Sequence, residues 1–238
     1  MSERFLRQEM LLGSEAMDKL NKSHVAVFGI GGVGSWCAEA LARAGVGALT
    51  LIDQDTVGES NINRQILALD STLGMDKSEA MARRIADINP LCRVTAICGR
   101  YEAADRERFF AEKYDYIVDA IDLVSCKVDL IVTAMERGIP IVSALGTGNK
   151  LDASLLRLCD ISKTEGCPLA RVVRKELRKR GITHHSVVFS PEEGLSPEQR
   201  EAPPPGRRSI PGSLVWVPAA AGLLLAQQVV LDIAGIEY

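Results

Sequence analysis

The hexapeptide GIGGVG at residues 29–34 has the spacing of a turn that holds nucleotide phosphates. Gly29, Gly31 and Gly34 repeat as G-x-G-x-x-G, with Gly32 inside the turn. The first glycine allows a tight turn, the second lets the backbone approach a phosphate, and the third lets a helix pack closely on a strand. The pattern favours nucleotide binding, although a turn that needs glycine only for steric reasons would have the same sequence.

Polar residues that could bind the rest of a nucleotide follow in the segment DQDTVGESNINRQIL at 53–67. Asp53 could accept hydrogen bonds from ribose hydroxyls. Asn61, Arg64 and Gln65 supply donors, and the forked guanidinium of arginine suits phosphate oxygens. A nicotinamide dinucleotide has no triphosphate for this cation to hold. The segment therefore favours ATP over NAD, which the glycine turn by itself does not exclude.

Two further charged residues could complete a site for ATP and Mg²⁺. Lys77 begins an amphipathic segment and adds a positive charge, and Asp122 ends a strand-like segment and could hold Mg²⁺ on the phosphates. Each residue has an ordinary alternative: Lys77 as an exposed helix residue, Asp122 as a helix N-cap and Arg64 as a solvated loop charge. Open α/β sheets bind ligands at the carboxyl ends of their strands. We therefore assign catalytic roles to all three.

The placement of these residues depends on an alternation of strands and helices. Strand-like segments lie at 24–30, 47–53, 93–99, 114–122, 139–146, 153–161 and 184–192, and helical segments at 32–45, 75–90, 123–138 and 168–181. The alternation predicts an α/β fold, with a Rossmann-like, mostly parallel sheet, helices on both faces and additional C-terminal strands. Because the sequence has no internal repeat and no second glycine turn, we predict a single ATP-binding domain over 1–238. A flexible, proline-rich crossover loop is expected at 191–212.

The net charge of the 238 residues is −3, so the protein has no general cationic field for nucleic acid. Positive charge is instead concentrated in the helical segment 168–181, and two more arginines lie in the proline-rich loop. Such a patch suits a phosphate backbone, with salt-sensitive affinity. Because Glu176 partly offsets the charge, a solvated helix surface is the alternative. The residues assigned to nucleic acid are Arg171, Arg174, Lys175, Arg178, Lys179, Arg207 and Arg208.

None of the six cysteines is spaced C-x-x-C, and the N-terminus is charged without an apolar signal core. We therefore expect free thiols and a cytoplasmic protein. An apolar segment at 213–235 is interrupted by Pro218, Gln227, Gln228 and Asp232. Since a spanning helix needs about 20 apolar residues, we predict a buried helix beginning near Pro218 and no stable membrane insertion. Peripheral membrane contact is the alternative.

The motifs GIGGVGSW, LIDQDTVGESNINRQ and DAID, with Lys77, resemble an adenylating family. This family includes ubiquitin-activating enzymes and the sulfur-carrier adenylyltransferases for molybdopterin and thiamine. The resemblance runs from RFLRQ, residues 4–8, to about residue 150. It implies that Asp53 binds ribose and Asp122 binds Mg²⁺. It also implies phosphate contacts for Asn61, Arg64 and Lys77.

The same resemblance implies a homodimer. In the family, the arginine of NRQ typically reaches the nucleotide of the neighbouring subunit, which implies this role for Arg64. Arg7 of RFLRQ is implied to assist in a similar way.

The last third of the sequence distinguishes branches of this family. Sulfur-carrier-activating members often bind zinc through two C-x-x-C pairs, whereas Cys159 and Cys167 are wider apart and have no second pair. Tetrahedral zinc would lack its four thiolates, so we expect no structural zinc. The segments CDISKTEGCPLARVVRKELRKRG, VVFSPE and INP instead resemble the tRNA threonylcarbamoyladenosine dehydratase branch. Leu123 departs from the polar residue that many relatives carry there.

This branch implies ATP-dependent dehydration of threonylcarbamoyladenosine next to the anticodon. The substrate carboxylate would attack the α-phosphate of ATP, and the neighbouring carbamoyl group would then displace AMP and close a ring. The partner implied is tRNA, and a sulfur-transfer protein is a further possible partner. The alternatives are a sulfur-carrier adenylyltransferase, an NAD-dependent oxidoreductase and a non-catalytic tRNA-binding module.

No protein nucleophile is needed in this reaction. We therefore interpret Cys159 and Cys167 as structural, with a thioester or persulfide nucleophile as the alternative. His184 and His185 could assist proton transfer, but a pair of polar surface residues is the simpler interpretation.

Overall fold

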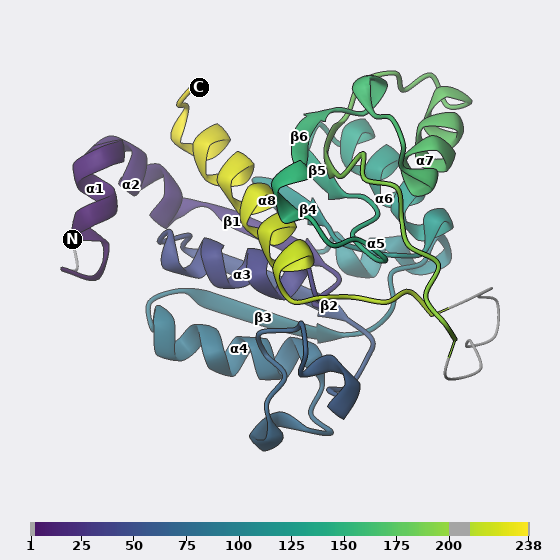
Figure 1. Cartoon of the computed structure of the whole chain (residues 1–238). Helices are drawn as coiled ribbons and strands as arrows, with labels where there is room; N and C mark the ends of the chain where they lie inside the picture. Colours follow the sequence, from purple (N-terminus) through teal and green to yellow (C-terminus); the bar gives the residue numbers. More distant parts are fainter. Residues whose placement is uncertain (1–2, 200–209, 238) are drawn as a thin grey trace.

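The computed structural model describes residues 3–199 and 210–237, and within them the chain forms a seven-stranded sheet between two layers of helices (Figure 1). The strand order is β3-β2-β1-β4-β5-β7-β6. All neighbouring strands are parallel except β6 and β7. This architecture confirms the predicted fold class. The strands are β1 His24–Phe28, β2 Ala48–Asp53, β3 Arg93–Cys98, β4 Tyr116–Asp119, β5 Ile141–Ala144, β6 Arg157–Asp160 and β7 Ser186–Phe189.

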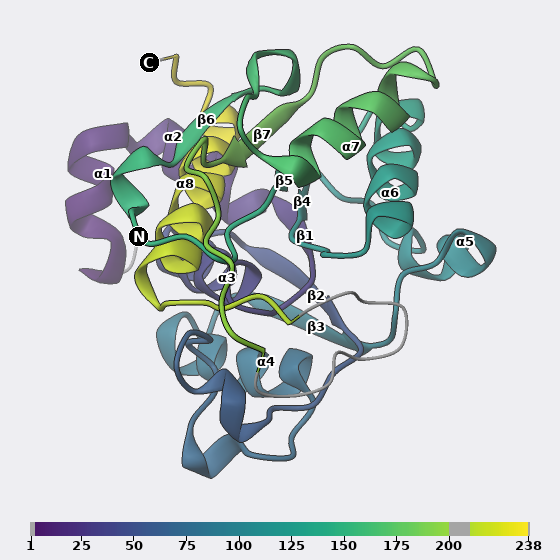
Figure 2. The same ribbon diagram turned by 45° about the vertical axis from the view of Figure 1, so that its right-hand side comes forward.

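The helices divide between the two faces of the sheet (Figure 2). On one face, Leu41, Met81 and Leu225 belong to a core with the sheet. On the other face, Leu130 and Val173 belong to a second core. The central strands are buried on both sides, as their continuous apolar runs predict. The α-helices are α1 Leu6–Leu12, α2 Ser14–Lys22, α3 Gly34–Arg43, α4 Lys77–Ile88, α5 Arg106–Phe109, α6 Val124–Glu136, α7 Pro168–Arg178 and α8 Trp216–Ala234.

The predicted strands and helices are all present, but one boundary differs in a way that affects the site. The fourth strand ends at Asp119, so Asp122 lies in the following loop and the prediction that it ends a strand is wrong. The last helix begins at Trp216, near Pro218 as predicted, and the proline lies in its first turn, where it is tolerated. Helices α1, α2 and the short α5 were not predicted.

Helix α8 is long and apolar enough to cross a membrane by length and composition, but half of its most apolar window is buried inside this fold. It packs against the start of α3. A Cβ atom on Gly222 would lie 2.4 Å from the carbonyl oxygen of Val33. This close packing agrees with the predicted buried helix.

The described parts of the proline-rich segment, 191–199 and 210–212, are tied to the chain that follows β5. Asn149 Oδ1 accepts a hydrogen bond from the Gly212 amide at 2.6 Å. The Leu195 amide donates to the Asn149 carbonyl at 2.7 Å, and Lys150 Nζ donates to the Ser190 carbonyl at 3.1 Å. Both ends of this segment therefore meet near the carboxyl end of β5. The predicted nucleic-acid residues Arg207 and Arg208 lie outside the described residues.

Candidate active site

The glycine turn joins β1 to α3, and its geometry requires glycine at two positions. Gly29 has φ +88°, and a Cβ there would lie 2.7 Å from the Ala120 carbonyl oxygen. A Cβ on Gly34 would lie 1.8 Å from the Gly29 carbonyl oxygen, so this glycine allows α3 to begin directly against the turn. Among the described residues, the only atom within 4 Å of a Cβ on Gly31 would be the side-chain nitrogen Nε2 of Gln65, at 3.9 Å. The backbone at Gly31 is therefore open to a phosphate group.

Asp53, the last residue of β2, is hydrogen-bonded to the glycine turn. Its Oδ2 accepts from the Ile30 amide at 2.6 Å and its Oδ1 from the Asp55 amide at 2.8 Å. Burial raises the pKa of this carboxyl group, although the two amides and the nearby Lys77 oppose the shift. The carboxylate thus connects the end of β2 to the phosphate turn. Each oxygen also retains a second lone pair for a ribose hydroxyl.

Lys77 is buried, with 6% of its surface exposed, so its interpretation as an exposed helix residue is wrong. Its Nζ lies 2.9 Å from Asp55 Oδ2, and its backbone amide donates to the Asp55 carbonyl at 3.0 Å. A buried ammonium needs such a partner. Asp55 was missed in the sequence, where the second aspartate of DQD was the available signal. The side chain of Asp55 is 55% exposed, so the ion pair opens to solvent on one side.

Arg64 lies beside the glycine turn of its own chain. Its Cγ is 3.5 Å from the position of a Cβ on Gly32. Its Nη1 donates to the Ser60 carbonyl and to Asn63 Oδ1, both at 2.8 Å. Burial lowers the pKa of the guanidinium, which nevertheless remains charged in proteins. Arg64 is partly buried, and its two hydrogen bonds hold the guanidinium beside the glycine turn.

The amide residues on either side of Arg64 differ in their hydrogen bonding. Asn61 Oδ1 accepts from the Gly58 amide at 3.2 Å and closes the local turn. Gln65 is buried, and its Oε1 has no hydrogen-bond partner among the residues that the structure describes. A buried acceptor without a partner is unusual in a folded protein. The Gln65 atom nearest to Gly31 is the side-chain nitrogen Nε2, 3.9 Å from the position of a Cβ there, and this nitrogen can donate to a phosphate at the turn.

Asp122 is exposed in the loop between β4 and α6. Its interpretation as an N-cap is wrong, because Leu123 caps α6 without a side-chain hydrogen bond. The loop adjoins the glycine turn through Ala120, whose amide donates to the Phe28 carbonyl at 2.8 Å. Over residues 3–199 and 210–237, no three His, Cys, Asp or Glu side chains form a metal-binding group. One carboxylate beside a phosphate turn nevertheless fits Mg²⁺, which commonly takes its other ligands from phosphates and water.

Arg7 is far from the glycine turn of its own chain. It is exposed on α1, and the neighbouring Gln8 Nε2 donates to the Ala44 carbonyl just beyond the end of α3 at 2.8 Å. The glycine turn lies at the opposite end of α3, about 15 Å away for a helix of this length. Arg7 therefore does not join the site of its own chain.

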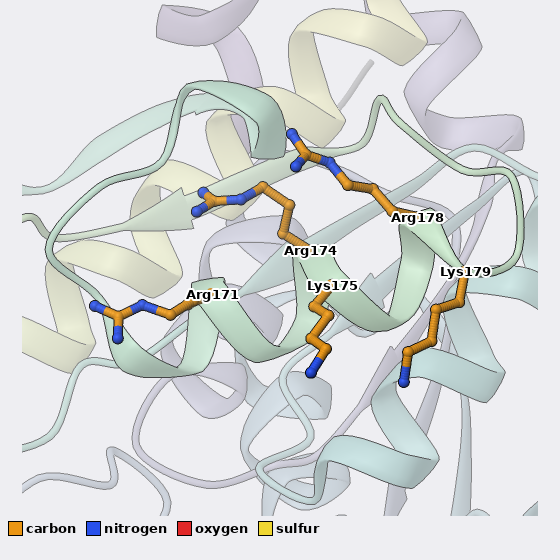
Figure 3. A pocket seen from close by; sticks show the side chains of 5 residues that line it. All are labelled: Arg171, Arg174, Lys175, Arg178 and Lys179. Atoms are coloured by element: carbon orange, nitrogen blue, oxygen red, sulfur yellow. The ribbon is translucent and has the colours of Figure 1, made fainter.

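The basic residues of α7 gather around one shallow hollow (Figure 3). Arg174 is partly structural, since its Nη1 donates to the Thr164 carbonyl at 2.6 Å. Lys179 Nζ lies 2.6 Å from the carboxylate of Glu176, which also pairs with Arg180. Arg171, Lys175 and Arg178 are exposed. The residues that line the hollow are Arg171, Arg174, Lys175, Arg178 and Lys179.

The cysteines and histidines of the last third have mostly structural surroundings. Cys167 is buried and caps α7, with its Sγ accepting from the Ala170 amide at 3.5 Å. Burial raises the pKa of Cys159, which disfavours a nucleophilic thiolate. His184 is exposed, 3.3 Å from Asp160 Oδ2. His185 is buried, with its Nε2 2.8 Å from Ser143 Oγ, so its interpretation as polar surface is wrong.

A glycine turn after β1, an acidic residue at the end of β2 and a buried lysine at the start of α4 define a nucleotide-binding α/β protein. The chain belongs to the ThiF family, whose profile matches residues 5–236. This match confirms the resemblance drawn from the motifs.

Two relatives within this family cover most of the chain. The chain is 42% identical over 242 residues to a tRNA threonylcarbamoyladenosine dehydratase of Bacillus subtilis, covering 98% of this chain and 95% of the relative. It is 40% identical over 204 residues to the protein of the same name from Escherichia coli, covering 82% and 76%. The crystal structure of the Escherichia coli enzyme in complex with ATP superposes with a TM-score of 0.88 at 36% identity, covering 98% and 94%.

A sulfur-carrier relative matches less of the chain. The molybdopterin-synthase adenylyltransferase of Escherichia coli is 35% identical over 142 residues, which cover 59% of this chain and 57% of the relative. The dehydratases of Bacillus subtilis and Escherichia coli therefore match more of the chain than this adenylyltransferase does.

Proposed function

We propose that this protein is an ATP-dependent tRNA threonylcarbamoyladenosine dehydratase. The observation that carries the proposal is the match to a relative of that name over 98% of the chain. The α7 region belongs to the part of the chain in which the sequence motifs separate this branch from the sulfur-carrier enzymes. The site supports the same function, because it has a phosphate turn and two cations close to it.

The proposed reaction removes one water from the substrate by activating its carboxylate. The carboxylate oxygen attacks the α-phosphate of ATP and pyrophosphate leaves, which gives an acyl adenylate. A carbamoyl nitrogen then attacks the activated carbonyl carbon, loses its proton and displaces AMP, which closes the ring. AMP is a good leaving group and hydroxide a poor one, so adenylation makes ring closure possible. The nucleophile belongs to the substrate, in agreement with the structural surroundings of Cys159 and Cys167.

In this proposal the chain contributes position and charge. Open backbone at Gly31 receives a phosphate, and Asp53 accepts from ribose hydroxyls. Lys77 and Arg64 neutralise charge that moves from the substrate to the phosphates. Asn61 and Gln65 supply polar contacts around them. Asp122 would hold Mg²⁺, which supplies charge neutralisation and orientation of the phosphates when bound.

The proposal extends to the assembly and the substrate. The hollow on α7 would bind the tRNA backbone, with Arg207 and Arg208 as additional contacts. The whole chain would act as one domain without structural zinc, in a cytoplasmic homodimer in which Arg7 and Arg64 reach the neighbouring site. For Arg64 this requires the side chain to leave its position beside the glycine turn of its own chain. The position of Arg7 supports this arrangement, because Arg7 lies far from the glycine turn of its own chain. A sulfur-transfer protein is retained as a possible further partner.

The test is mass spectrometry of nucleosides from tRNA incubated with the protein, ATP and Mg²⁺. We expect threonylcarbamoyladenosine to lose one water, with release of AMP and pyrophosphate. Lys77→Ala and tRNA that lacks the modification are the controls. An unchanged nucleoside mass with folded protein would refute the proposal. Pyrophosphate exchange that requires a protein ending in Gly-Gly would favour the sulfur-carrier alternative, and tighter calorimetric binding of NAD than of ATP–Mg²⁺ would favour an oxidoreductase.

A further inference from the structure

A second lysine–aspartate pair lies at the carboxyl end of β4 and is completely buried. Lys127 of α6 and Asp119, the last residue of β4, both have side chains with 0% exposure, and Lys127 Nζ lies 2.7 Å from Asp119 Oδ2. The same ammonium donates to the carbonyl of Ala144, the last residue of β5, at 2.9 Å. The pair thus joins α6 to the ends of two adjacent strands.

Stability alone gives little reason for such a pair. Removing two charges from water costs several kcal/mol per ion, and well-packed apolar residues of similar volume are often at least as stable. Lys127 is nevertheless among the largest fully buried side chains. We therefore look for its role in the part of the structure that the pair holds in place.

The pair holds the loop that carries Asp122. Asp119 Oδ2 accepts a hydrogen bond from Lys127 Nζ, and Asp119 Oδ1 accepts one from the Ile121 amide at 3.0 Å. On the other side, Ala120 is so close to the glycine turn that a Cβ on Gly29 would lie 2.7 Å from its carbonyl oxygen. The loop is therefore fixed between the ion pair and the phosphate turn.

The hydrogen bonds of α6 fix the other end of the same loop. The Lys127 amide donates to the Leu123 carbonyl at 2.9 Å, which starts the first turn of α6 directly after Asp122. Lys127 thus contacts the loop through its backbone and, by way of Asp119, through its side chain. With no exposed surface, neither member of the pair can touch a nucleotide.

We infer that Asp119 and Lys127 are positioning residues that set the distance between Asp122 and the phosphates on the glycine turn. The inference rests on the proposed function, because it takes Asp122 as the ligand of the nucleotide's Mg²⁺. Groups that orient a metal ligand typically change metal affinity by about 10- to 100-fold when they are removed. The pair therefore controls how strongly Mg²⁺ enhances ATP binding, while binding of ATP without metal depends on the glycine turn and the cations.

The test measures the dissociation constant of ATP by isothermal titration calorimetry, with Mg²⁺ and with EDTA. The test variant is D119L/K127M, which replaces both charges by apolar side chains of similar size and removes the acceptor for Ile121. We expect it to bind ATP in EDTA as the native chain does, and the enhancement by Mg²⁺ to fall by about tenfold or more. The matched control is E39L/R84M, which removes the largely buried Glu39–Arg84 pair of α3 and α4, 2.6 Å apart, without touching the loop. We expect it to retain the full enhancement.

A native-like enhancement in folded D119L/K127M would overturn the inference, as would an equal loss in the control. If D119L/K127M does not fold, D119N/K127M serves instead. It retains an acceptor for Ile121 but loses the Lys127 anchor, so an intermediate loss supports the inference and no loss overturns it. Asp122→Asn separates the two proposals. If D122N retains the enhancement, the assignment of Asp122 as the metal ligand fails, and the positioning inference fails with it. If only D122N loses the enhancement, the positioning inference alone fails.

Discussion

The buried imidazole of His185 makes a quantitative prediction about acid stability. The side chain precedes β7, is 4% exposed and has its Nε2 2.8 Å from Ser143 Oγ. Burial lowers its pKa to about 3, the nearby Lys127 ammonium acts in the same direction, and Asp160 opposes them. His185 is therefore neutral in the folded protein throughout the range in which an unfolded histidine titrates.

The sign and size of the effect follow from proton linkage. An unfolded histidine takes up a proton below its ordinary pKa of about 6.5, whereas the folded ring does not until about pH 3, so the unfolded state gains protons as the pH falls. Stability contributed by this site is complete above pH 6.5 and is lost progressively below it. At pH 5 the loss is about 2 kcal/mol, since each pH unit corresponds to about 1.4 kcal/mol.

The assay compares the native chain with His185→Gln by urea unfolding at pH 7.5 and pH 5.0. We expect the native chain to lose about 2 kcal/mol more than H185Q on acidification. The pKa of His24 is also lowered by burial, but His24 is present in both proteins and its contribution cancels. Equal losses in the two proteins would refute the reasoning, because they would mean that the folded ring accepts a proton near neutral pH.

Three further predictions test the site. The variants Arg64→Ala and Lys77→Ala should each be inactive. If Arg64 acts across a two-fold homodimer, a mixture of the two variants regains about a quarter of native activity, because about half of the dimers are mixed and each mixed dimer has one intact site. A mixture that stays inactive would place Arg64 in the site of its own chain. Replacing Lys175 and Arg178 by Gln should weaken tRNA binding at low salt, measured by fluorescence anisotropy, while ATP binding is retained. The slope of log affinity against log salt should fall by the equivalent of about one to two phosphate contacts. A loss of affinity that does not depend on salt would contradict a phosphate role. Gly34→Ala should destabilise the protein by about 3 kcal/mol in thermal unfolding, because the new Cβ would lie 1.8 Å from the Gly29 carbonyl oxygen, and a native-like Tm would refute the close packing.

The sheet was predictable because its strands carry a strong local signal. In β1 and β4 every residue is buried, so continuous apolar runs marked these strands in the sequence. The end of β4 was less predictable. The residues DAID continue the same kind of composition, but the backbone pairing of β4 ends at Asp119, whose side chain accepts from the Ile121 amide in the following loop.

The positions of the site cations were not predictable in the same way. Lys77 is a common residue at the start of a helix, and its burial depends on Asp55, which lies 22 residues earlier in a loop. For Lys127 a signal was present. Leu130 and Ile131 follow it at the spacing of one helix face and are both fully buried, so the lysine lies on the apolar side of α6. A charged residue at such a position needs a buried partner, but the partner itself comes from the end of a strand.

The two lysines flank the glycine turn, because β1 lies between β2 and β4 in the sheet. Lys77 pairs with Asp55 just beyond β2, and Lys127 pairs with Asp119 at the end of β4. The exposure of the partner separates their roles. Asp55 is 55% exposed, so an arriving phosphate can share or replace its contact with Lys77, whereas Asp119 is sealed at 0% and Lys127 cannot exchange it. One pair can therefore respond to a nucleotide, and the other holds the loop against which the nucleotide must fit.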